Sequence, residues 1–267
     1  MDVSQFNPGM DLYEGNHLSV CRARLEPGVY CLMPRTFTFF DDLPGWERTR
    51  ILNNATPDMG AQFIMGQLVM QENGGNTDPI DNGFENFLFI LEGSVTVSYG
   101  ATVTLTEEGF CYLPPHTAFS VREAAGRTAR LLWIKKEYVP APGLNAPEAF
   151  SGSSAKLTEQ RSTHVLKKEC LPFESDMRFD MGVNLLTYLP GVSFPRAEAH
   201  MCEHGCYFLQ GRGGMWLNGE HHEVHADDFL YIAPCTPHYA VGYAPEPLRY
   251  LLFKEANRDY PLAYDKQ

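Results

Sequence analysis

Short apolar segments bounded by glycine, proline or polar turn residues recur along this chain. Residues 63–70, 87–97 and 110–113 are rich in Phe, Leu, Ile, Val and Met, and polar turns at 72–76 and 107–109 separate them. Strands of this length, repeated about every 8 to 12 residues, are typical of sandwiches and barrels. The pattern therefore predicts an all-β protein with few short helices.

The second half of the chain repeats the apolar pattern of the first. The matching segments are 89–93 with 207–211 at an offset of 118 residues, and 110–113 with 229–232 and 131–135 with 250–254 at an offset of 119. We therefore expect two β-barrels of one design. The N-terminal barrel would span residues 1–140 and the C-terminal barrel 156–267, with a linker rich in Pro, Gly and Ser over 141–155.

Four candidate metal ligands lie in the second half. Glu198, His200 and His204 are separated by two and four residues, and residues at even spacing share one face of an extended strand. Pro195 before them and a glycine-rich turn after them favour a strand over a helix. His238 follows a proline-containing turn and is a candidate fourth ligand. One carboxylate with imidazoles suits a borderline divalent ion such as Mn, Fe, Co, Ni or Zn.

The duplication allows these residues to be compared with their copies. The first-half equivalents, in the same order, are Ile80, Asn82, Asn86 and Phe119. None of them is a strong metal ligand. Ordinary polar residues would not be expected to disappear together from the copy. We therefore expect a metal-free, structural first barrel and a second barrel that carries the chemistry.

Composition and charge narrow the classes of partner. The net charge of −12 opposes binding to nucleic acid and to anionic membranes, and leaves a small-molecule substrate open. No apolar run approaches the roughly 18 residues of a membrane span, and residues 1–5 lack the features of a signal peptide. Seven cysteines without framework spacing fit a cytoplasmic protein with reduced thiols. Because barrels of this kind tend to cover sheet edges and apolar faces with copies of themselves, we expect a homo-oligomer.

The chain resembles the (S)-ureidoglycine aminohydrolase family, which belongs to allantoin and purine catabolism. The resemblance covers roughly residues 50–262, and the best-matching segments are 71–76, 87–93, 198–205 and 254–259. It implies a tandem cupin (bicupin) of two jelly-roll β-barrels, whose second barrel binds Mn²⁺. By this resemblance the metal ligands are Glu198, His200 and His204, and His238 falls at the position of the fourth ligand.

The resemblance also implies an activity, the hydrolytic release of ammonia from (S)-ureidoglycine to give (S)-ureidoglycolate. Tyr250 and Lys254 match a Tyr and a Lys, four residues apart, that contact the substrate in this family. Lys254 would hold the substrate carboxylate, Tyr250 would bind its polar end, and Glu198 would transfer a proton. A solvent-facing lysine at a strand end is the alternative for Lys254, because the first half retains Lys135 at that position, whereas Tyr250 is replaced there by Leu131.

Two residues depart from the family pattern, His238 in place of Gln and Met215 in place of Tyr. Both are expected in the pocket as substrate contacts, so they bear on the identity of the substrate. With His238 the set becomes one Glu and three His, which is common among other metal cupins. The alternatives are therefore a metal-dependent dioxygenase or isomerase acting on a small organic acid, and a non-enzymatic bicupin that binds a small ligand.

Overall fold

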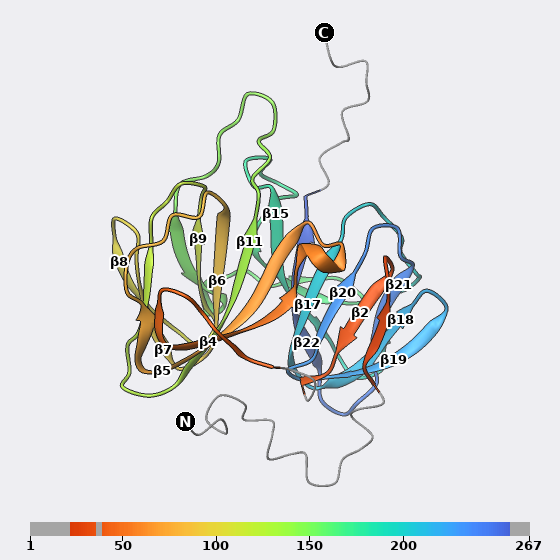
Figure 1. Cartoon of the computed structure of the whole chain (residues 1–267). Helices are drawn as coiled ribbons and strands as arrows, with labels where there is room; N and C mark the ends of the chain where they lie inside the picture. Colours follow the sequence, from red (N-terminus) through yellow and green to blue (C-terminus); the bar gives the residue numbers. More distant parts are fainter. Residues whose placement is uncertain (1–21, 36–38, 257–267) are drawn as a thin grey trace.

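The computed structural model describes residues 22–35 and 39–256, and strands dominate this part of the chain (Figure 1). Helical structure there includes two short 3-10 helices, η4 (Pro57–Met59) and η5 (Ser154–Lys156). None of the helices in the described ranges is long and apolar enough to cross a bilayer. The predicted all-β fold with two barrels is confirmed. Two stretches used in the sequence analysis, residues 1–5 and 257–259, lie outside the described residues.

The first barrel is built from one ten-stranded antiparallel sheet. Its strands are β3 (Asp41–Asp42), β4 (Trp46–Ala55), β5 (Phe63–Asn76), β6 (Glu85–Glu92), β7 (Ser94–Ser98), β8 (Thr102–Thr106), β9 (Gly109–Leu113), β10 (Ser120–Glu123), β11 (Ala129–Lys136) and β12 (Phe150–Ser153). The order is β12-β9-β6-β11-β5-β10-β7-β8, with β4 also beside β5 and β3 beside β4. The long strand β5 pairs with β11 over its first half and with β10 near its end, so the sheet curls on itself.

The second barrel combines an eight-stranded and a four-stranded sheet. Its strands are β1 (Arg24–Glu26), β2 (Tyr30–Met33), β13 (Gln160–Arg161), β14 (Leu166–Leu171), β15 (Met181–Tyr188), β16 (Val192–Ser193), β17 (His204–Gln210), β18 (Arg212–Leu217), β19 (Glu220–His225), β20 (Phe229–Ile232), β21 (His238–Gly242) and β22 (Leu248–Glu255). The larger sheet has the order β1-β2-β20-β17-β22-β15-β14-β13, and the smaller sheet β16-β21-β18-β19.

The two halves exchange a strand with each other. Strand β2 pairs with β20 of the second barrel, with Cys31 opposite Tyr231. Strand β12 pairs with β9 of the first barrel, with Phe150 opposite Tyr112. Cys31 and Phe150 are 119 residues apart, as are the two tyrosines, so the exchange follows the duplication. Each exchanged strand covers backbone groups of β9 or β20 that would otherwise form an open sheet edge.

The expected domain boundaries need correction at these strands. Residues 24–33 were expected in the first barrel but join the sheet of the second, and residues 150–153 of the expected linker join the sheet of the first. The apolar pattern of a strand does not specify which distant edge the strand will pair with. For the rest of the chain, the boundary between the two barrels near residue 140 stays our proposal.

Both faces of the large sheets are buried, which explains their nearly continuous apolar sequences. In β11, Leu131 and Trp133 pack in the interior of the first barrel, whereas Leu132 and Ile134 pack in a core shared by both barrels. That shared core contains Phe63 of β5, whose ring stacks on Phe253 of β22 with centroids 4.0 Å apart. A third core fills the second barrel. The barrels are therefore joined by an apolar interface between their two large sheets.

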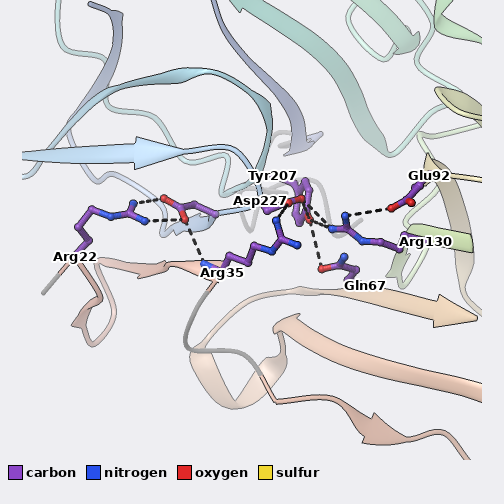
Figure 2. Close-up of polar contacts among 8 residues, drawn as sticks. Arg22, Arg35, Gln67, Glu92, Arg130, Tyr207 and Asp227 are labelled. Carbon is purple, nitrogen blue, oxygen red and sulfur yellow. Dashed lines mark hydrogen bonds and ion pairs between the residues drawn. The ribbon is translucent and has the colours of Figure 1, made fainter. Parts of the chain in front are cut away.

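Polar contacts at the barrel interface also follow the duplication. Arg130 Nη2 lies 2.9 Å from Asp227 Oδ1, the hydroxyl of Tyr207 donates to the same oxygen at 2.8 Å, and Arg35 approaches the other oxygen at 2.6 Å (Figure 2). At the equivalent positions, 119 residues away, Arg249 pairs with Glu108. Burial alone would raise the pKa of Asp227, but the charges of Arg130 and Arg35 hold this pKa below its usual value. Each barrel thus contributes an arginine that binds an acidic turn of the other.

Candidate metal centre and pocket

Three histidine side chains converge inside the second barrel. His204 begins strand β17, His238 begins β21, and His200 lies in the loop between β16 and β17. Their ring centroids are 4.8 to 5.2 Å apart, and one nitrogen from each ring lies within 4.8 Å of the others. In the part of the chain that the structure describes, this is the group of His, Cys, Asp or Glu side chains whose geometry fits a metal ion.

The segment 198–204 is not the continuous strand that its spacing predicts. Glu198 forms an isolated bridge with His238, and His200 has no strand conformation. Backbone hydrogen bonds hold the loop instead, because the amide of Cys235 donates to the carbonyl of His200 at 2.7 Å and Glu198 and His238 exchange bonds of 2.8 and 2.9 Å. The histidines therefore converge because their loop is held against the turn before β21. The alternation of side chains along a strand does not by itself explain their convergence.

The hydrogen bonds of two rings leave one nitrogen of each free to act as a ligand. Nδ1 of His200 lies 3.1 Å from the carbonyl oxygen of Cys202, and Nδ1 of His238 lies 2.8 Å from that of Thr236. A carbonyl only accepts, so each Nδ1 carries the proton and each Nε2 presents a lone pair. Nε2 of His200 lies 3.3 Å from Nε2 of His204. Nitrogen atoms arranged in this way suit a shared cation.

The surroundings keep these imidazoles neutral, which is the form that binds metals. Burial lowers the pKa of His200, His204 and His238, and the nearby charge of Lys254 lowers each of them further. The effect is largest for His204, which is only 4% exposed. The donor set and its protonation state therefore fit a divalent metal ion.

A cavity of about 190 Å³ opens beside the three histidines. Its walls include the other residues predicted for the site: Glu198, Met215, Tyr250 and Lys254. The carboxylate of Glu198 is not among the clustered ligand atoms, but its backbone pairing with His238 directs both side chains to the same face. Metal binding by Glu198 is thus compatible with the fold and stays a prediction.

The remaining predicted side chains differ in exposure. Met215 is buried, and Tyr250 is buried with its ring stacked on that of Tyr188 at 6.1 Å between centroids. Burial raises the pKa of Tyr250, so its hydroxyl stays protonated. Lys254 lies at the pocket wall with Nζ 4.0 Å from a carboxylate oxygen of Glu174. Its side chain is 24% exposed, so both the substrate-binding role of Lys254 and the solvent-facing alternative stay predictions.

Three polar residues of the pocket were not singled out from the sequence, namely Lys167, Glu174 and Asn184. Lys167 Nζ lies 3.0 Å from Glu174, which places both near Lys254. Asn184 is the polar residue within the apolar run 181–186 of strand β15, and this interruption was a signal in the sequence. Its position on the pocket face could not be assigned without the neighbouring strands.

The first barrel has the same backbone arrangement with different side chains. Ile80 and Phe119 form an isolated bridge equivalent to that of Glu198 and His238. Asn82 and Asn86 occupy the positions of His200 and His204, and their amides bond each other at 2.9 and 3.1 Å. The indole of Trp133 donates to Asn86 at 2.9 Å. These amide groups thus satisfy one another where the second barrel presents imidazole nitrogens.

A buried acid beside the histidines is explained by the same comparison. Glu203 accepts hydrogen bonds from the hydroxyl of Tyr231 at 2.9 Å and the amide of Gln62 at 2.8 Å, and burial raises its pKa to about 7. The first barrel contains the equivalent pair, Glu85 and Tyr112, with a bond of 3.1 Å. Because this pair also occurs where there is no histidine cluster, we assign Glu203 a structural role.

Comparisons with known proteins agree with this fold. Residues 184–254 match the family described as "Cupin domain". The chain is 30% identical over 245 residues to the (S)-ureidoglycine aminohydrolase of Escherichia coli K12, covering 89% of this chain and 92% of that protein. The crystal structure of protein YlbA from E. coli superposes with a TM-score of 0.83 at 28% identity, covering 93% of this chain and 99% of the other.

A more distant structure shares the fold alone. Bacillus subtilis oxalate decarboxylase superposes with a TM-score of 0.66 at 12% identity, over 87% of this chain and 78% of the other. The likeness to the aminohydrolase and to protein YlbA is thus much stronger, and it extends over about nine-tenths of this chain. The chain belongs to the (S)-ureidoglycine aminohydrolase family of two-barrel cupins.

Proposed function

We propose that this protein hydrolyses (S)-ureidoglycine to (S)-ureidoglycolate and ammonia, as a cytoplasmic enzyme of allantoin degradation. The observation that carries the proposal is the convergence of His200, His204 and His238 beside a pocket that also contains Lys254. The relative from E. coli K12 is named for this activity. In the reaction, the bond between the substrate carbon and its amino nitrogen breaks, and a water oxygen takes the place of that nitrogen.

The three histidines and Glu198 would hold a divalent metal, which we propose to be Mn²⁺. A metal bound there supplies Lewis-acid catalysis and a template for the substrate. Lys254, at the pocket wall, pairs with the substrate carboxylate. The protonated hydroxyl of Tyr250 donates a hydrogen bond to a polar group of the substrate. Met215 forms an apolar wall of the pocket.

Glu198 is suited to move protons within this site. Besides its proposed place in the metal site, Glu198 lines the pocket, and its segment is hydrogen-bonded to the turn before β21. From this place it can accept a proton from the attacking water and pass a proton to the departing amino group. The same side chain would thus accept the proton from water and donate the proton to the leaving amino group.

An ammonia assay with the metal-loaded protein tests the proposal. We expect release of ammonia from (S)-ureidoglycine above the rate of a boiled sample, loss of this activity after treatment with a chelator, and recovery when Mn²⁺ is added back. A metal-loaded protein that releases no ammonia would refute the aminohydrolase. Oxygen uptake with a panel of small organic acids would then favour the dioxygenase alternative, which the third histidine of the site motivates.

Substitutions at His238 test the metal set. His238→Gln should keep the metal, because a glutamine amide oxygen can replace the imidazole as a ligand, whereas His238→Ala should weaken metal affinity at least about tenfold. Metal content after dialysis against a graded chelator measures both variants. Equal metal retention by the alanine variant and the wild type would remove His238 from the ligand set.

We also propose that the enzyme is a homo-oligomer. The exchanged strands β2 and β12 cover sheet edges within one chain, so an oligomer would form through other surfaces. Size-exclusion chromatography coupled to light scattering decides this point, because a mass equal to the 30.1 kDa of one chain would exclude it.

A further inference from the structure

The pocket contains a buried amide whose acceptor has no protein partner. Asn184, in strand β15, is 3% exposed and lines the cavity next to the three histidines. Its Oδ1 is fully buried and makes no hydrogen bond with any of the described residues. A buried acceptor without a donor destabilises the fold unless a ligand or water supplies one. The unpartnered acceptor is costly for folding, and because Asn184 lines the pocket, a bound ligand can supply the missing donor.

The strand pairing places this amide on the same sheet as His204, two strands away and on the pocket face. Asn184 pairs with Leu252 of β22, and Leu252 pairs with Cys206 of β17. His204, the first residue of β17, pairs with Lys254 in the neighbouring row. Adjacent strands are about 4.8 Å apart, so the backbone of Asn184 lies about 10 Å from that of β17. A substrate that contacts both the amide and the imidazoles would therefore lie over strand β22, whose Lys254 also lines the cavity.

The side chain of Asn184 faces the cavity and not the other barrel. Leu186 and Tyr188 follow it at even spacing in β15, and both also line the cavity. Leu185, at odd spacing, packs in the core shared by the barrels. Alternation along the strand thus assigns Asn184 to the pocket face.

The chemistry of a primary amide identifies the group that it would bind. Such an amide offers one acceptor oxygen and two N–H donors, and a ureido group offers N–H donors and a carbonyl acceptor in matching order. We propose that Asn184 binds the ureido group of the substrate, while Lys254 binds its carboxylate. This inference rests on the proposed function, and it adds the residue that would distinguish ureido acids from other small acids.

The duplicated half supports a specific role for this amide. The strands 66–70 and 184–188 are equivalent, so the copy of Asn184 is Gly66 in β5. The side chain of Ile51 approaches Gly66 closely enough to fill the place of a side chain there. The amide therefore occurs only in the half of the chain that has the histidine cluster.

A pair of ligands that differ in one group tests the inference. N-carbamoylglycine carries a ureido group, and N-acetylglycine carries a methyl group where the terminal amino group of the urea stands, while both keep the carboxylate for Lys254. We expect the metal-loaded wild type to bind N-carbamoylglycine about tenfold more tightly, the value of one well-formed hydrogen bond. In Asn184→Leu and Asn184→Ala this preference should fall to within about twofold. Titration calorimetry measures both affinities.

Asn54 provides a matched control. It is 2% exposed, its Oδ1 also lacks a partner among the described residues, and it lies in β4 of the first barrel outside the pocket. Asn54→Leu should keep the wild-type preference for N-carbamoylglycine. Metal content and circular dichroism verify that each variant is folded.

The outcomes separate this inference from the proposed function. Equal binding of the two ligands by the wild type, or a preference retained in both Asn184 variants, would overturn the inference even if ammonia is released from ureidoglycine. A preference that depends on Asn184 would uphold it even if ammonia release fails, and then only the proposed reaction would be wrong.

Discussion

Replacing His204 by alanine is expected to remove the metal and to lower ammonia release by about 1,000-fold or more. His204 is the most deeply buried of the three histidines, and its strand β17 is paired on both sides, with β20 and β22. Loss of this ligand leaves the substrate without Lewis-acid assistance, which is worth several kcal/mol, and each factor of ten in rate corresponds to about 1.4 kcal/mol. Elemental analysis and the ammonia assay measure the two effects.

The first barrel supplies the control for this variant. Asn86 occupies the equivalent position and is equally buried, with hydrogen bonds to Asn82 and Trp133. Asn86→Ala should lower the melting temperature through loss of these bonds but should leave metal content and the rate of ammonia release close to those of the wild type. If His204→Ala retains a full equivalent of metal, or if Asn86→Ala loses it, the metal site has been assigned to the wrong barrel.

Replacing Lys136 by methionine is expected to destabilise the protein by about 3 to 5 kcal/mol, the cost of breaking a buried ion pair on one side. Lys136 ends strand β11 and pairs with Asp180, which precedes β15 of the other barrel. The two side chains are 3% and 1% exposed. Asp180 also accepts a hydrogen bond from the amide of Val139 at 2.7 Å. Removal of the ammonium group takes away the positive charge that Lys136 provides to the buried carboxylate of Asp180, and urea denaturation measures the loss of stability.

Two further variants distinguish this explanation from a general loss of packing. In the double variant Lys136→Met, Asp180→Leu, both charges are absent, so most of the lost stability should return. Arg178→Met breaks an ion pair with Asp176 that is largely exposed, and it should change stability little. A double variant no more stable than Lys136→Met would show that the charge of Asp180 is not the cause.

The two barrels and the histidine cluster could be predicted from local and periodic patterns. The offsets of 118 and 119 residues identify equivalent positions, and the structure contains the same isolated bridge at both, between Ile80 and Phe119 and between Glu198 and His238. The prediction that His200, His204 and His238 meet was therefore sound, because the duplicated framework places them together. The detail that segment 198–204 forms a strand was wrong, since hydrogen bonds to the turn before β21 determine its conformation.

Features that depend on pairing between distant segments could not be predicted. Strand β2 pairs with residues about 200 positions away in the chain, and β12 with residues about 40 positions away. The apolar alternation of a strand does not depend on which sheet edge it pairs with, so the pattern could not identify these partners. The contact of Arg130 with Asp227 belongs to the same class, because it links turns and strands of different barrels. Asn184 was missed for a related reason, since an unpartnered amide is recognised only when its neighbours on other strands are known.

The amino-acid sequence by itself determined that this protein is a duplicated all-β chain with one half carrying an acid and three imidazoles, because periodicity and residue chemistry are local properties. Only the tertiary structure decided which edges the exchanged strands cover, how the loop before β17 brings His200 to His204, and that Asn184 and Lys254 line the same pocket as the histidines. These features arise from hydrogen bonds and packing between segments far apart in the chain, and their partners are defined only when the sheets have closed.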